Sequence, residues 1–169
     1  MLSLPKSLPK AARKGLPVVC DKLRSMRTIT MSLAFALVAS LAPSAQVATP
    51  ITVYKTPTCG CCGKWVEHMR QSGFAPKVTD LPNLSAVKQS SGVPQNLQSC
   101  HTSMIDGYAI EGHVPADVIR QLLKEKPKVA GIAVPGMPMG SPGMEGAYKD
   151  KFNVVAFAQD GTQKVYASR

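Results

Sequence analysis

The sequence predicts a small α/β domain: a mixed sheet flanked by helices, with an added C-terminal β-hairpin. Three observations predict it. Short β-rich runs alternate with segments of helical period along the chain. The length, 169 residues, is near that of one ordinary domain. Apolar residues make up 44% and charged residues 18%, which is enough apolar content for a core and argues against a disordered chain.

The first part of the predicted domain is a strand, a cysteine-containing loop, a helix, a second strand and a short helix. Residues 51–54 are a β-rich run, and residues 77–81 a second one. Residues 63–73 are predicted to be helical, with Gly73 as the stop, because apolar residues follow one stripe. The stripe consists of Cys62, Trp65, Val66 and Met69. Asn83 is the expected cap of a short helix that runs to Ser90.

The second part is a hairpin, a helix, a strand and a final hairpin. The expected ranges are 99–105 and 108–111 for the first hairpin, 115–126 for the helix, 129–134 for the strand, and 152–158 with 163–167 for the last hairpin. Pro115 opens this helix and Pro127 prevents its continuation. Strand, cysteine loop, helix, strand, helix, hairpin, helix is the order of the thioredoxin-like fold, so we expect a thioredoxin-like sheet.

The front of the chain, residues 1–44, is predicted to be a secretory signal peptide. Residues 29–41 form an apolar run of 13 residues behind Arg24 and Arg27. A membrane-spanning helix needs roughly 20 apolar residues, so the run fits a signal peptide better. Cleavage is expected between residues 44 and 48, which leaves a periplasmic domain, 45–169, with no stable membrane insertion. An uncleaved anchor or a buried helix is the alternative.

The charge distribution argues against nucleic acid as a partner. The formal net charge is +10, but residues 1–44 carry +6 of it, and the predicted exported domain only +4. Aromatic residues make up 5% of the chain and include a single tryptophan, Trp65. Proteins that stack bases on aromatic side chains need more of them.

Four cysteines remain once Cys20 leaves with the signal peptide, and three of them are crowded into Cys59-Gly60-Cys61-Cys62. A structural disulfide framework spreads its cysteines to close long loops, so this crowding favours metal binding or redox exchange. Thiolates select soft metals such as Cu(I), whereas zinc is typically held by two separated pairs. The spacing therefore favours copper over zinc, with disulfides alone as the plain alternative.

Cys100 is the candidate fourth sulfur ligand, because the start of the third strand faces the cysteine loop in thioredoxin-like folds. Its neighbour His101 should point to the opposite face, which predicts a surface or supporting group rather than a ligand. His68 is expected to be solvated. His113, just before the helix at Pro115, is a candidate ligand, with helix capping or hydrogen bonding as the alternative.

The loop at residues 135–146 is rich in Pro, Gly and Met. Thioethers are soft ligands for Cu(I), so Met137 and Met139 are candidate copper ligands. Methionine more often fills gaps in a core, and a lid packing over the cysteine loop is the alternative.

Several segments together resemble one family, the CopG-type periplasmic copper-resistance proteins, often described only as a metal-binding domain of unknown function. The match covers nearly all of the chain after the signal, in order: residues 53–65 (VYKTPTCGCCGKW), 73–74, 99–101, 112–116 and 131–138 (GIAVPGMP). The resemblance implies a thioredoxin-like fold and a cysteine-bridged cluster of several Cu(I) ions. By position, Cys59, Cys61 and Cys62 match the family's C-x-C-C and Cys100 its distal cysteine.

Three functions follow from these observations. The first is a periplasmic copper-binding protein for copper tolerance, with Cu(I)/Cu(II) redox chemistry left open and a copper efflux or oxidase system as candidate partner. The second is a thiol–disulfide or arsenate-reductase-like oxidoreductase with Cys59 as nucleophile and Cys62 as resolving thiol. The third is an exported structural domain whose cysteines merely pair. The sequence leaves open whether the protein is an enzyme.

Overall fold

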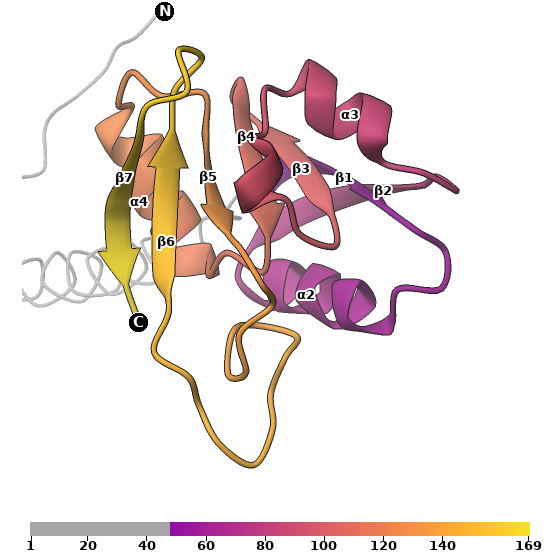
Figure 1. The fold of residues 1–169 in the computed structure, drawn as a ribbon. Helices are drawn as coiled ribbons and strands as arrows, with labels where there is room; N and C mark the ends of the chain where they lie inside the picture. The colour runs from indigo at the N-terminus through magenta and orange to yellow at the C-terminus, as the bar shows by residue number, and fades with distance from the viewer. Residues whose placement is uncertain (1–47) are drawn as a thin grey trace, which may run out of the picture. The chain divides into compact units, whose positions relative to one another are not determined.

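A computed structural model describes residues 48–169 of the chain. The predicted signal peptide, with Cys20, lies outside the described residues. A seven-stranded sheet in the order β2-β1-β3-β4-β5-β6-β7 forms the centre (Figure 1). Its strands are β1 (Thr49–Lys55), β2 (Phe74–Asp80), β3 (Thr102–Ile105), β4 (Tyr108–Gly112), β5 (Gly131–Val134), β6 (Asn153–Phe157) and β7 (Gln163–Ser168). The helices are α2 (Gly60–Gln71), α3 (Ser85–Ser90) and α4 (Ala116–Glu125), with a 3₁₀ turn, η1 (Gln95–Leu97).

The sheet is mixed, as predicted. β1 pairs in parallel with β2 and antiparallel with β3, and β3 continues into an antiparallel hairpin with β4. β4 and β5 are parallel, and α4 makes the crossover between them. The antiparallel pairs β5–β6 and β6–β7 complete the sheet, so the predicted C-terminal hairpin is confirmed.

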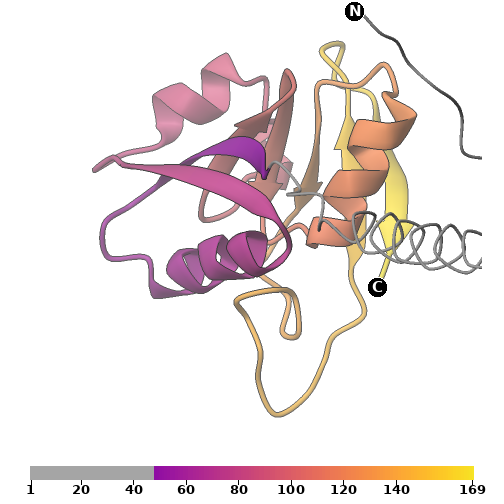
Figure 2. The same cartoon turned by 180° about the vertical axis from the view of Figure 1, so that it is seen from behind.

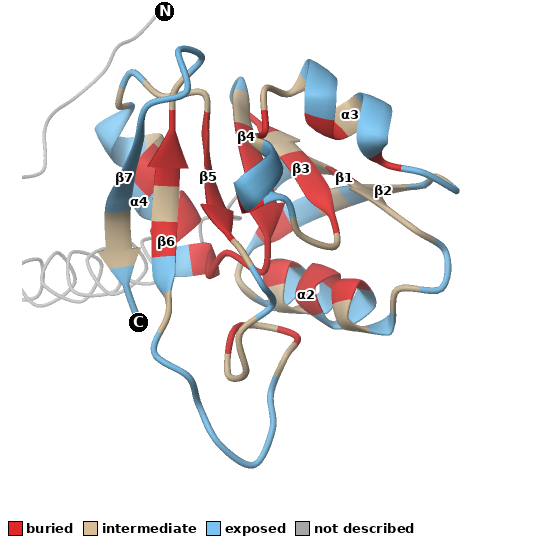
Figure 3. Cartoon of the chain, viewed as in Figure 1, coloured by how far each residue is buried: buried red, intermediate tan, exposed pale blue. Residues whose placement is uncertain are grey.

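The two faces of the sheet are covered differently. α2 and α4 lie on one face and α3 on the other (Figure 2). The larger core lies under α2 and α4, where Trp65 and Leu122 meet Ile110 of the central strand β4. The smaller core on the opposite face is built on Phe157 and Leu97. Burial is concentrated on β3 to β5 and on the inner sides of the helices, whereas β7 forms an exposed edge (Figure 3).

Several element boundaries differ from the prediction by a few residues (β2, for example, begins at Phe74 rather than residue 77), and two of these changes concern cysteines. α2 begins at Gly60 rather than residue 63, because the turn after Pro57 already places Cys59 at the N-cap and the Gly63 N–H donates to the Cys59 carbonyl. β3 begins at Thr102 rather than residue 99, so Cys100 precedes the strand instead of heading it. The predicted cap of α3 is shifted as well: the Asn83 side chain accepts the N–H of Ser85, 2.7 Å away.

Within the described part of the chain, no helix is both long and apolar enough to cross a membrane.

Candidate metal centre

The cysteine loop ends in the first turn of α2. Cys59 is the N-cap residue and Cys61 and Cys62 lie in the first turn. In the part of the chain that the structure describes, no side chain caps this end of the helix, and its first turn contains no acidic residue. The first N–H groups of a helix have no intrahelical partners and favour negative charge nearby. This end of α2 is therefore suited to thiolates.

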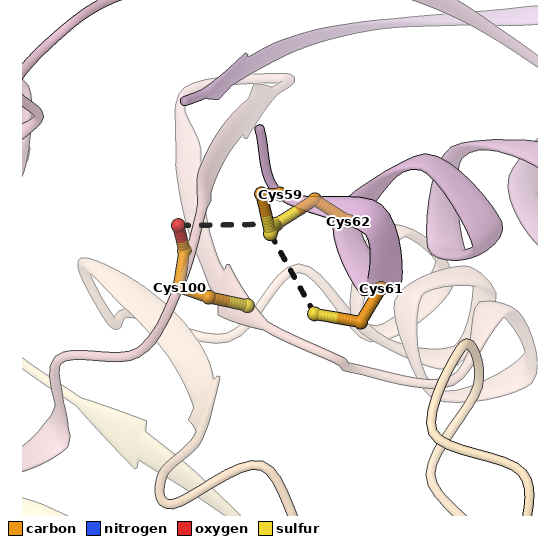
Figure 4. Close-up of side chains that lie close together, drawn as sticks. All are labelled: Cys59, Cys61, Cys62 and Cys100. Atoms are coloured by element: carbon orange, nitrogen blue, oxygen red, sulfur yellow. Dashed lines mark hydrogen bonds between the residues drawn. A yellow bond between two sulfur atoms is a disulfide. The ribbon is translucent and has the colours of Figure 1, made fainter. Parts of the chain in front are cut away.

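The structure brings Cys100 to the other three cysteines. The four Sγ atoms lie within 4.8 Å of one another (Figure 4). Cys59 and Cys62 are joined in a disulfide, while Cys61 and Cys100 are free thiols. Cys61 Sγ lies 3.6 Å from Cys59 Sγ, and Cys62 Sγ lies 4.0 Å from the carbonyl oxygen of Cys100. Reduction of the disulfide by two electrons would supply four thiols in one place.

His113 faces Cys100. Its Nε2 atom lies 2.9 Å from Cys100 Sγ, and its Nδ1 lies 2.7 Å from the carbonyl oxygen of Pro142. A carbonyl can only accept, so Nδ1 carries the proton and Nε2 presents a lone pair toward the sulfur. A backbone carbonyl that orients a histidine in this way is the usual support of a metal-binding imidazole.

His101, expected to be a surface or supporting group, does not lie at the surface, so the surface alternative was wrong. It is fully buried, with its ring 4.4 Å from that of Trp65 and 5.1 Å from that of His113. Its Nδ1 lies 3.4 Å from Cys100 Sγ, because the two residues precede β3 and the alternation of strand side chains does not apply. Nε2 of His101 has no hydrogen-bond partner among residues 48–169. Cys100, His101 and His113 thus form a second group of possible ligands that shares Cys100 with the sulfurs.

Burial keeps these groups uncharged. It raises the pKa of Cys100 to about 12, with the neighbouring Cys61 thiol adding to the effect. Burial lowers the pKa of His113, and it lowers that of His101 strongly, where the neighbouring His113 and Lys88 add to it. Neutral imidazole is the form that binds metal, whereas the Cys100 thiol must lose its proton when a metal binds.

The Met-containing loop packs against the start of α2 through Gly143. A Cβ atom at this position, whose φ is +87°, would lie 2.7 Å from the Cys61 carbonyl oxygen and 2.9 Å from the Trp65 nitrogen. Met137 is exposed, and the sulfur of Met139 packs on Gly146 within the same loop. The structure thus brings the loop to the site at Gly143.

His68, expected to be solvated, is half-buried and has a structural partner. Its Nε2 atom accepts the N–H of Ala116, the first residue of α4, at 3.3 Å. Burial lowers the pKa of His68. Its contact with a helix N-terminus 48 positions along the chain left no signal in the local sequence pattern.

Four thiol or disulfide sulfurs and two neutral imidazoles are donors of soft to intermediate character, which suit Cu(I), Cu(II) or zinc rather than hard cations such as magnesium. A small mixed α/β domain with this donor set at the start of a helix defines a candidate thiolate metal-binding protein. Two solved structures, both titled copper resistance protein CopG (forms 1 and 2), match the chain at 43% identity with a TM-score of 0.68. Each match covers 72% of this chain and 98% of the solved one. The chain belongs to the family of the copper resistance protein CopG.

The family model "Protein of unknown function, DUF411" matches residues 97–144, which contain Cys100, both buried histidines and most of the Met-containing loop. No curated protein matches the sequence.

Proposed function

We propose that the protein is exported to the periplasm as residues 45–169, after removal of residues 1–44, and holds several Cu(I) ions there for copper tolerance. The ions are bridged by the thiolates of Cys59, Cys61, Cys62 and Cys100 in the reduced protein. The single observation that carries the proposal is the meeting of these four sulfurs within 4.8 Å, although Cys100 is 38 positions from Cys62 in the chain.

The chemistry of the donors supports copper. Thiolates are the ligands that select Cu(I), and closely spaced thiolates can share one sulfur between two ions. His113 completes the proposed ligand set, since its Nε2 lone pair already faces Cys100. We also propose that one thioether of the 135–146 loop, Met137 or Met139, contacts copper, because the loop is anchored at the site through Gly143.

The arrangement of elements supports the further proposal that the fold is thioredoxin-like. β1, α2 and β2 form a parallel unit with a C-x-x-C (Cys59 to Cys62) at the start of its helix. The β3–β4 hairpin follows, and α4 returns to the face that α2 covers. A periplasmic copper efflux or oxidase system is the partner expected to receive or supply the metal.

The test is an anaerobic titration of the reduced protein with Cu(I), purified from cells that express the full chain. The wild type should bind several ions per chain, and Cys61→Ser and Cys100→Ser should each lose most of this capacity. Thr58→Ser, on the same loop, is the matched control and should bind as the wild type does. Capacity that survives both cysteine substitutions would contradict the proposal.

A second candidate function is thiol–disulfide exchange, which the Cys59–Cys62 disulfide favours. In this reaction a substrate disulfide is reduced while Cys59 and Cys62 are oxidised, with Cys59 as nucleophile and Cys62 as resolving thiol. Insulin reduction that is lost in Cys59→Ser but survives in Cys61→Ser would favour the exchange reaction. Activity that survives in Cys59→Ser would contradict Cys59 as the nucleophile, and a wild type that does not reduce insulin would leave copper binding as the only candidate of the two.

A further inference from the structure

A buried ion pair lies next to the site and belongs to none of the proposed ligands. Glu111 of β4 is fully buried, and its Oε1 atom lies 2.5 Å from Nζ of Lys88. Lys88 is the single buried residue of the short helix α3. Charged side chains are almost never buried without a partner, so the pair needs a physical explanation.

The carboxylate of Glu111 accepts hydrogen bonds from the chain on both sides of Cys100 and His101. Its Oε1 atom accepts the backbone N–H of Ser99 at 2.5 Å, and its Oε2 atom accepts the hydroxyl of Thr102 at 2.6 Å. The ammonium of Lys88 also donates to the Thr102 hydroxyl, at 3.1 Å. One buried carboxylate therefore fixes residues 99 and 102, and the two residues between them carry potential metal ligands.

The backbone of β4 also holds residues 99–102 in place. Thr102 stands opposite Glu111 in the β3–β4 register, and the N–H of Gly112 donates to the His101 carbonyl at 2.9 Å. Gly112 has a φ of +71°, and a Cβ there would lie 2.6 Å from the Ser99 hydroxyl oxygen. Residues 99–102 are thus pressed against β4, with the Cys100 thiol facing the cysteine loop and His113.

Stability alone does not account for the pair. A buried ion pair is weak evidence for stability, because removing two charges from water costs about as much as their attraction returns. Apolar side chains could dock α3 equally well. The pair differs from an apolar contact in its fixed hydrogen-bond geometry, which is directed at the backbone and side chain that flank Cys100.

We propose that Glu111, oriented by Lys88, is a positioning residue that holds residues 99–102 so that the Cys100 sulfur meets the other three cysteines and His113. This inference rests on the proposed function, because it assigns the orientation of the fourth sulfur ligand to residues outside the ligand set. Loss of an outer partner of a metal ligand typically weakens metal binding about 10- to 100-fold.

The first arm of the test measures Cu(I) affinity by competition with a coloured Cu(I) chelator. Glu111→Gln keeps the shape of the side chain but turns a donor amide toward Lys88 or Ser99, and should weaken Cu(I) binding about 10-fold or more. Combined with Cys100→Ser, Glu111→Gln should add little further loss, since the two changes remove the same ligand. A fully additive loss would show that Glu111 acts elsewhere and would overturn the proposal.

The second arm needs no metal. In the reduced, metal-free protein, Cys100 should be alkylated at least about fivefold faster in Glu111→Gln than in the wild type, because a segment held by fewer bonds opens more readily. The rate at Cys61 should change little. Unchanged alkylation of Cys100 would overturn the proposal. Failure of the wild type to bind Cu(I) would instead refute the proposed function, while this arm would still decide the role of Glu111.

Two variants guard against a trivial loss of folding. Thr102→Val keeps the side-chain shape and removes only the hydroxyl that bonds Glu111 and Lys88. Cys100 should be alkylated faster in this variant too, so it replaces Glu111→Gln if that variant does not fold. Leu122→Ala in α4 lowers stability without touching residues 99–102 and should leave Cu(I) affinity at the wild-type value. Equal weakening of Cu(I) binding in Leu122→Ala would show that general destabilisation, not positioning, causes the effect.

Discussion

The two helices on the same face of the sheet, α2 and α4, begin in opposite ways. At the start of α4, the N–H of Ala116 donates to His68, and Asp117 supplies a negative charge in the first turn. The N-cap side chain makes no hydrogen bond in either helix, but within the described residues the start of α2 has neither a histidine partner of this kind nor an acidic residue in its first turn. Cysteines stand there instead, with Cys59 at the N-cap.

This difference shows how one core can serve a structural helix and a functional one. Both helices bury their apolar stripes in the same cluster, through Trp65 in α2 and Leu122 in α4. Their packing is therefore alike, and only their first turns differ. One free N–H of α4, that of Ala116, is satisfied by His68, whereas the first N–H groups of α2 face the cysteines and can stabilise sulfur-borne negative charge.

The largest expected effect separates stability from metal binding. Leu122→Ala removes a fully buried side chain of α4 and should lower the free energy of unfolding by about 2–5 kcal/mol, with copper capacity unchanged. Cys61→Ser changes a partly exposed side chain of α2 and should cost about 0.5 kcal/mol or less, with copper capacity lost. Denaturant unfolding of the metal-free protein measures the stability of each variant, and copper analysis measures its copper capacity. If each variant lost both stability and copper capacity, the distinction between a structural α4 and a functional α2 would be wrong.

The contact between the Met-containing loop and α2 should produce the next largest effect. Gly143→Ala places a Cβ against two backbone atoms of α2 and also forces alanine to a φ of +87°. We expect the free energy of unfolding to fall by about 1–2 kcal/mol because of the left-handed backbone and by about 1–3 kcal/mol more because of the overpacking. Denaturant unfolding measures the total.

Gly161→Ala is the matched control for this contact. Gly161 has nearly the same φ, +84°, but a Cβ there would meet nothing within 4 Å. The difference between the two variants therefore isolates the contact of the loop with α2. Equal losses of unfolding free energy in the two variants would show that the start of α2 shifts to accommodate the added methyl group.

Local pattern was enough to predict the elements of the regular core. Pro115 and Pro127 marked the two ends of a predicted helix at 115–126, and the structure has it at Ala116–Glu125. The final hairpin was predicted at 152–158 with 163–167, and it forms between β6 and β7. In both elements, neighbours in the sequence supply the interactions that decide the structure.

The site was only partly predictable, because contacts distant in sequence complete it. The crowding of Cys59, Cys61 and Cys62 is visible in the sequence, and the expected element order placed Cys100 beside them. The burial of His101 was not visible, since it depends on Glu111, twelve positions beyond Ser99, holding the chain before β3 starts. The rule that strand side chains alternate between the two faces of a sheet does not apply to His101, because this residue lies outside β3.

Acidification should weaken the start of α4, in addition to the region of His101 and His113, whose pKa values burial also lowers. Burial lowers the pKa of His68 in the folded protein, so the unfolded chain, with a histidine pKa near 6.5, binds more protons as the pH falls below about 7. The free energy of unfolding of the metal-free protein should therefore decrease between pH 7.5 and 5.5. His68→Gln, whose amide oxygen can still accept the Ala116 N–H, should show a smaller decrease. An equal decrease in both would mean that His68 does not contribute.

The smallest effect concerns the charge that α4 has and α2 lacks. Asp117→Asn removes the negative charge from the first turn of α4, along with its ion pair to Arg169. The expected loss is about 0.3–1 kcal/mol in the free energy of unfolding at low salt, with no change in copper capacity. Because salt screens exposed charges within about 3 Å at 1 M, unfolding curves at that concentration should show almost no difference from the wild type. A loss that persisted in 1 M salt would show that Asp117 stabilises α4 by packing, and the contrast between the two helix starts would then not be electrostatic.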